Sequence, residues 1–106
     1  MERKIKNILA ELGLKQYLPG FQYIIEAEMM MKEDRHKRLY MIYREIGEEH
    51  GKSDRHVYQA IKWVIDSADT SKPLYKEVMK TEERVSIYMF VNSLYLYLWE
   101  DRKNED

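Results

Sequence analysis

The chain has 106 residues, of which 44% are hydrophobic and 35% charged, with no cysteine and a formal net charge of −1. This length suits one compact domain and is short for two. The absence of cysteine excludes a disulfide-stapled secreted mini-protein and a zinc site of the cysteine type. The aromatic and aliphatic content argues against a disordered chain.

The positive charges gather in the centre of the chain. Residues 35–62 contain seven lysines and arginines against four acidic residues, whereas the remainder of the chain is acidic overall. A basic centre indicates a local anionic partner, and the alternative is an ordinary solvated face.

The start of the chain and its most hydrophobic run favour a soluble, cytoplasmic protein that does not enter a membrane. The first four residues are followed by no apolar stretch of the signal-peptide kind. The run from Val85 to Trp99 is 15 residues long and contains Asn92 and Ser93, so it is short for a membrane span.

The first half of the chain is predicted to form two helices. Gly13 is placed to end the first helix in a left-handed conformation, and residues 14–20 form a connector. The second helix is expected to begin at Phe21 and to end near the charged stretch 32–37. The first helix is predicted from apolar residues at helical spacing: Ile5, Ile8, Leu9 and Leu12.

Three further helices follow along the chain. A third helix is predicted over residues 38–50 and is broken by Gly51. Ser53 is a suitable N-cap for a fourth helix over residues 53–68. Pro73 suits the first turn of a short fifth helix.

A last helix is predicted over residues 82–100, and its apolar side chains surround the whole circumference. Such a helix requires burial on every side. It is therefore either the central core helix or a subunit interface, which would make the protein a homodimer.

The third and fourth helices have helix-turn-helix spacing. Two helices that cross at a large angle touch near the turn, so Gly47 supplies a position without a side chain. Gly51 suits the tight reversal and the branched Val57 fills the angle between the helices, with Ile46 and Ile61 as apolar flanks. The sequence thus predicts one all-α domain over residues 1–106, with about six helices and a helix-turn-helix at residues 38–68. The alternative is a helical hairpin with the same spacing by chance.

The polar side of the fourth helix carries residue types that bind DNA. Arg55, His56, Gln59 and Lys62 are expected to face away from the apolar stripe and to contact base edges or phosphates. Basic residues outside that side are expected to position the DNA backbone: Arg38, Arg44 and Lys52.

Several segments resemble the C-terminal DNA-binding effector domain of the stage-zero sporulation response regulator. The resemblance runs from about Lys4 to Ala68 and is carried by ILAELGL at 8–14, GFQYIIEA at 20–27 and the residues of the predicted helix-turn-helix. It implies a six-helix domain whose fourth helix lies in the major groove of double-stranded DNA. It also implies a dimer that contacts RNA polymerase.

The chain departs from that family in two respects. It carries no receiver domain, so control by phosphorylation is not expected. In the fourth helix, His56 and Gln59 stand where the family has arginines, and Lys62 keeps only the charge at another arginine. Either a different DNA sequence is recognised, or the scaffold has lost DNA binding and serves as a protein-interaction module.

No motif indicates catalysis. The spacings of His36, His50 and His56 fit no common metal site, and the chain has no phosphate loop, nucleophile elbow or dinucleotide fingerprint. We therefore expect a protein that is not an enzyme and that needs neither a metal nor a cofactor.

Overall fold

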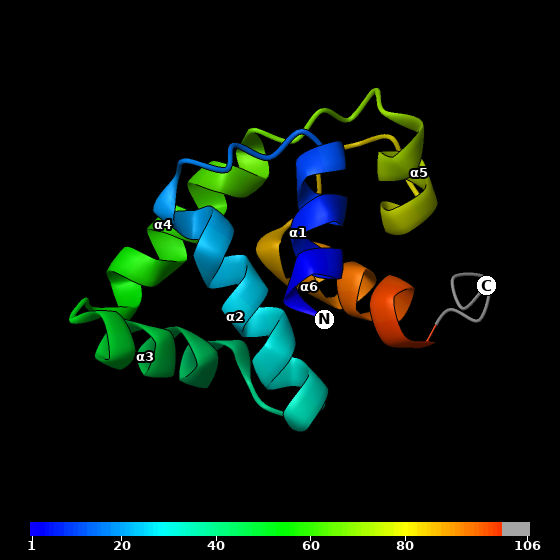
Figure 1. Cartoon of the computed structure of the whole chain (residues 1–106). Helices are drawn as coiled ribbons and strands as arrows, with labels where there is room; N and C mark the ends of the chain where they lie inside the picture. Colours follow the sequence, from blue (N-terminus) through cyan, green and yellow to red (C-terminus); the bar gives the residue numbers. More distant parts are fainter. Residues whose placement is uncertain (101–106) are drawn as a thin grey trace.

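The computed structural model describes residues 1–100, and every regular element in that range is helical (Figure 1). The predicted all-α class is therefore confirmed, and the described residues contain no strand. The elements are α1 (Glu2–Glu11), α2 (Pro19–Glu33), α3 (Leu39–His50), α4 (Asp54–Asp66), α5 (Pro73–Met79), α6 (Ile87–Tyr95) and a π-helical turn η1 (Leu96–Glu100).

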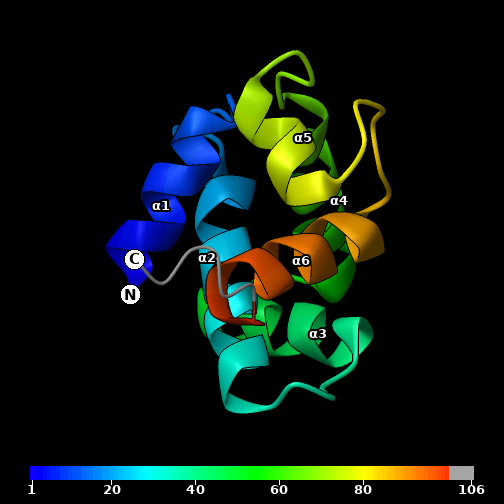
Figure 2. The same ribbon diagram turned by 90° about the vertical axis from the view of Figure 1, so that its right-hand side faces the viewer.

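Helix α2 lies at the centre of the packing. It contacts α1, α3, α4 and α6, while α5 packs against α6. Figure 2 shows α6 crossing the middle of the molecule, with α5 above it and α3 below. All six helices contribute to a single apolar core, represented by Ile5, Ile24, Ile42, Ile61, Val78 and Phe90.

The helix ends follow the local signals in the sequence. Gly13 and Gly51 both have positive φ angles, +90° and +68°, just beyond α1 and α3. The hydroxyl of Ser53 accepts a 3.0 Å hydrogen bond from the amide of His56 and caps α4. Pro73 stands in the first turn of α5, where its missing amide hydrogen costs nothing.

Gly20 brings the backbones of α2 and α4 into close contact. A Cβ atom at this position would lie 2.1 Å from the carbonyl oxygen of Ala60 and 2.9 Å from a methyl group of Val64. The two helices can therefore approach so closely only because residue 20 has no side chain. The sequence had assigned Gly20 to a connector, but α2 already begins at Pro19.

The last helix begins later than predicted. The sequence placed it at residues 82–100, whereas α6 starts at Ile87, with the Ser86 hydroxyl accepting a hydrogen bond from the amide of Met89. The preceding segment is held in a non-helical conformation, because Tyr75 donates a 2.8 Å hydrogen bond to the carbonyl oxygen of Glu83. The acidic residues at 82–83 thus belong to an exposed loop and not to a helix N-terminus.

The apolar circumference of α6 is only partly covered. Phe90, Val91 and Leu94 are buried in the core. Tyr88 is 65% exposed, and Met89 and Leu96 are also exposed. None of the helices in residues 1–100 combines the length and the apolar character needed to cross a membrane.

One carboxyl group is enclosed in the core. Glu28 of α2 is fully buried, and neither of its carboxylate oxygens has a hydrogen-bond partner among the described residues. Burial raises the pKa of Glu28 well above its ordinary value, because the charged form is poorly solvated there. The Arg35 guanidinium opposes this rise in pKa to a smaller extent.

The contact at Gly20 predicts that Gly20→Ala is severely destabilising. The added methyl group would meet backbone atoms of α4, which cannot move without displacing the whole helix. We expect a loss of about 3 kcal/mol or more in the free energy of unfolding, measured by urea denaturation. Gly51→Ala is the control, because it meets no atom within 4 Å and should cost only about 1 kcal/mol through its positive φ angle. Equal losses in the two variants would contradict the close contact.

The burial of Glu28 predicts a pH-dependent difference between the protein and its Glu28→Gln variant. The pKa of an ordinary glutamate in the unfolded chain is about 4.3, and folding raises the pKa of Glu28 above that value. Below the pKa of the unfolded chain the protonated carboxyl contributes its full share of the free energy of unfolding. This contribution is lost as the pH rises through the pKa of the folded protein. The free energy of unfolding should therefore decline by up to about 1.4 kcal/mol per pH unit in that window, relative to the glutamine variant.

Urea denaturation at a series of pH values measures this difference. Glu33→Gln is the matched control, since Glu33 is an exposed residue of the same helix. A glutamine variant at position 28 with the same pH profile as the unmodified protein would show that the buried carboxyl does not titrate as proposed.

Candidate nucleic-acid interface

A tight turn joins α3 to α4, and we call residues 47–57 the α3–α4 corner. Gly47 is buried there, and a Cβ atom on it would lie 2.5 Å from the carbonyl oxygen of Lys52. The amide of Lys52 donates a 2.7 Å hydrogen bond to the carbonyl oxygen of Gly47. Gly51 supplies the left-handed residue at the reversal. Both glycines thus occupy the positions that the spacing predicted.

Apolar side chains lock the two helices together behind the turn. Val57, Ile46 and Ile61 have no exposed surface, as the predicted spacing required. Next to them, the rings of Tyr43 and Tyr58 pack edge to face with their centroids 5.9 Å apart. Burial, and to a smaller extent the neighbouring Tyr58, raises the pKa of Tyr43 to about 12, so its hydroxyl stays protonated at neutral pH. The corner is therefore a rigid support for α4.

The opposite side of α4 faces the surroundings. We call it the α4 outer face, and its side chains are all exposed. Because the apolar stripe of α4 is buried against α2 and α3, this face is held in a fixed orientation. Its members are Arg55, His56, Gln59, Lys62, Trp63 and Asp66.

The structure brings five of the seven predicted DNA-binding residues close together. Arg55, His56, Gln59 and Lys62 share the α4 outer face, and Lys52 stands in the corner just before it. Arg44 is exposed in the middle of α3. Arg38 precedes the first residue of α3, and the 12 residues of that helix separate it by roughly 18 Å from the end of α3 that enters α4 through the turn.

Four of the predicted cations have no ion pair with any described residue, and these are Arg38, Arg44, Lys52 and Arg55. The Lys62 ammonium lies 4.0 Å from the Asp66 carboxylate, and both side chains are more than half exposed. Such an exposed pair is weak and yields easily to another anion. Helix α4 itself has equal numbers of acidic and basic residues, so the free cations around it provide the positive charge.

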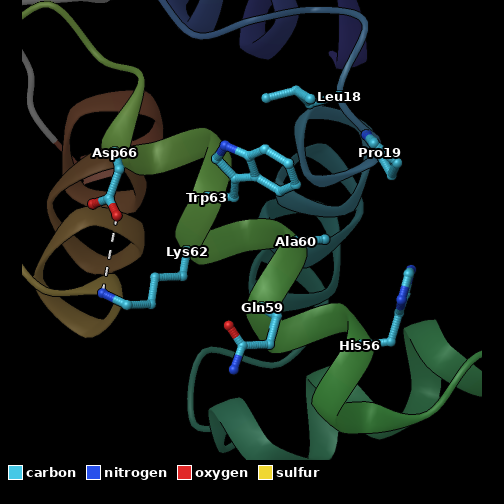
Figure 3. A pocket seen from close by; sticks show the side chains of 8 residues that line it. All are labelled: Leu18, Pro19, His56, Gln59, Ala60, Lys62, Trp63 and Asp66. Atoms are coloured by element: carbon cyan, nitrogen blue, oxygen red, sulfur yellow. Dashed lines mark ion pairs between the residues drawn. The ribbon is translucent and has the colours of Figure 1, made fainter.

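A groove of about 440 Å³ runs along one side of α4, and we call it the Trp63 groove (Figure 3). Figure 3 shows the Trp63 ring extending toward Leu18 and Pro19, while Lys62 extends toward Asp66 on the other side of the helix. Trp63 is 70% exposed despite its size. The groove is lined by Leu18, Pro19, His56, Gln59, Ala60, Lys62, Trp63 and Asp66.

Sequence reasoning missed the wall of this groove that does not belong to the polar side of α4. Leu18 and Pro19 were assigned to a connector, and Ala60 was not assigned to the site. The available signal was Gly20, because a glycine at the start of α2 permits the close contact that places Leu18 and Pro19 beside α4.

His50, which the sequence did not assign to the interface, connects α3 to α2. Its Nε2 atom lies 2.9 and 3.0 Å from the two carboxylate oxygens of Glu26. The ring of Tyr23 packs edge to face against both His50 and His56. These contacts hold the end of α3 and the start of α4 against α2. Residues 1–100 contain no group of three or more acidic or histidine side chains that could hold a metal ion.

Arg38 lines a second hollow of about 580 Å³ between the α2–α3 loop, the start of α3 and α6. Neighbouring cations there already have acidic partners. Lys37 pairs with Glu45 at 2.5 Å, and Arg35 lies 3.5 Å from Glu100. Arg38 therefore belongs to a surface separate from the α4 outer face.

No protein-family model, curated protein or solved structure matches this chain. The resemblance to the sporulation effector domain therefore rests on the sequence segments described above, and the function has to be argued from the site itself.

Proposed function

We propose that the protein is a sequence-specific DNA-binding transcriptional regulator that inserts α4 into the major groove through a helix-turn-helix formed by α3 and α4. The observation that carries this proposal is the exposure of the whole α4 outer face on a helix whose other side is locked in the core. An α-helix of this kind fits the width of the major groove.

Each predicted residue has a role in this proposal. Arg55, Gln59 and Lys62 stand at i, i+4 and i+7, so they follow the floor of the groove, and His56 contacts a base or a phosphate beside them. Separate cations lie outside this row and neutralise backbone phosphates: Arg38, Arg44 and Lys52.

The resemblance to the sporulation effector domain supports two further parts of the proposal. The first is a homodimer, for which the exposed Tyr88 and Met89 of α6 and Leu96 of η1 offer an apolar surface. The second is a contact with RNA polymerase, which the resemblance alone suggests. Both belong to a regulator that works in the cytoplasm.

A second candidate function is a protein-interaction module on the same scaffold. The Trp63 groove favours it, because an exposed tryptophan beside an apolar groove is typical of protein-binding sites. The balanced charge of α4 favours it as well, since most DNA-reading helices are basic.

The salt dependence of binding distinguishes the two candidates. If about four to six phosphates are neutralised, the logarithm of the association constant should fall against the logarithm of the salt concentration with a slope of about −4 to −5. Fluorescence anisotropy with a mixed-sequence duplex measures it, with a sizing column to record the oligomeric state. A flat response, together with a stable oligomer and no retention on heparin, would contradict DNA binding and support the protein-interaction module.

Alanine substitutions test which side chains read bases. Arg55→Ala and Gln59→Ala should each cost roughly 1–3 kcal/mol on a duplex selected from a random pool and less on mixed DNA, because only the selected duplex offers the matching base edges. Arg3→Ala and Asn7→Ala are the matched controls, since both residues are exposed on α1. Equal losses on both kinds of duplex would show that Arg55 and Gln59 contact only the backbone.

A further inference from the structure

The Trp63 groove and Gln59 together suggest which base pairs the α4 outer face would select. This inference rests on the proposed DNA binding and concerns its specificity. Arg55, at the first turn of α4, is the single guanidinium on this face. The middle of the face is formed instead by the amide of Gln59 and the ring of Trp63, and the half-buried Ala60 lines the groove beside them.

This combination of side chains matches the major-groove edge of an A·T base pair. Adenine presents N7 and the N6 amino group, which a glutamine amide contacts with two hydrogen bonds. Thymine presents a C5 methyl group, which favours apolar contact, and unmodified cytosine, adenine and guanine carry no methyl group there. Guanine is read by arginine or lysine, and the Lys62 ammonium lies 4.0 Å from the Asp66 carboxylate, at the side of the groove opposite Leu18 and Pro19 (Figure 3).

The exposed apolar surface gives this match a driving force. Trp63 remains 70% exposed in the isolated chain, and its ring and Leu18 form the upper part of the groove (Figure 3). Covering this surface with methyl groups removes apolar area from water on both partners. An A·T-rich major groove presents such methyl groups at regular intervals, next to adenines within reach of Gln59.

We propose that the α4 outer face selects A·T base pairs, with Gln59 contacting adenine and the Trp63 groove receiving the C5 methyl group of thymine. The occupant of the groove is then the methyl-bearing edge of duplex DNA and not a peptide. The neighbouring Lys52, which has no ion pair with a described residue, complements the phosphates that flank such an edge.

The test compares duplexes that differ only by the methyl group. The probes are an alternating A·T duplex of about two helical turns and the same duplex with deoxyuridine in place of every thymidine. The substitution keeps all hydrogen-bonding groups and removes the C5 methyl. We expect the protein to bind the deoxyuridine duplex about four-fold more weakly for each methyl group that is buried. An alternating G·C duplex should bind more tightly when its cytosines carry a C5 methyl group.

Variants show whether the groove causes this discrimination. Trp63→Ala should bind the thymidine and deoxyuridine duplexes nearly equally, whereas Trp63→Phe should keep part of the preference. Lys62→Ala should weaken binding to both duplexes by the same factor, because its contact does not involve the methyl group. Since Trp63 is largely exposed, circular dichroism is expected to show an unchanged helical fold in both Trp63 variants.

The outcomes separate this inference from the proposed function. Salt-sensitive binding to every duplex, without a difference between thymidine and deoxyuridine, overturns the A·T inference and leaves DNA binding standing. The same holds if Trp63→Ala discriminates as well as the unmodified protein. Failure to bind any duplex overturns both and leaves the groove to a protein partner.

Discussion

The close approach of α2 and α4 at Gly20 and Ala60 is the constraint on which the rest of the structure depends. A methyl group at position 20 would lie 2.1 Å from a carbonyl oxygen of α4. This contact fixes where α4 lies on α2, and the α3–α4 corner then fixes its direction from the other end. Because both supports act on the buried side of α4, the opposite side is left free.

The same contact creates the candidate site. With α2 beginning at Pro19, directly beside α4, Leu18 and Pro19 become a wall of the Trp63 groove. The α4 outer face therefore has an apolar side toward α2 and a charged side formed by Lys62 and Asp66 (Figure 3). A surface of mixed character distinguishes partners by shape and by apolar contact as well as by charge.

The buried Glu28 shows that the core is not optimised for stability alone. A carboxyl without a hydrogen-bond partner is costly inside a core, and protonation is the way to reduce that cost. It lies on α2, the helix that contacts four others. The stability of the packing around α2 is thereby linked to pH, whichever partner the α4 outer face binds.

Local signals were sufficient for most of the helices and for the corner. Apolar spacing and capping residues act within a few positions of the chain, so both ends of α3 and α4, the end of α1 and the start of α5 were predicted nearly correctly. Gly47, Gly51 and Val57 were assigned to the corner for the same reason. The predicted start of the last helix at residue 82 was wrong. Acidic residues such as those at 82–83 are typical of the first turn of a helix, but the hydrogen bond from Tyr75 to Glu83 holds that segment as a loop.

The sequence by itself determined that the chain is helical, where α3 turns into α4 and which polar side chains of α4 point outward, because these properties depend on neighbours three or four residues away. Only the tertiary structure decided that Glu28 is enclosed, that Arg38 lies apart from the corner and that a groove runs beside Trp63. Each of these depends on segments that are distant in the chain and meet only when α2 packs against its neighbours. Helical periodicity carries no information about contacts between segments that are distant in the sequence.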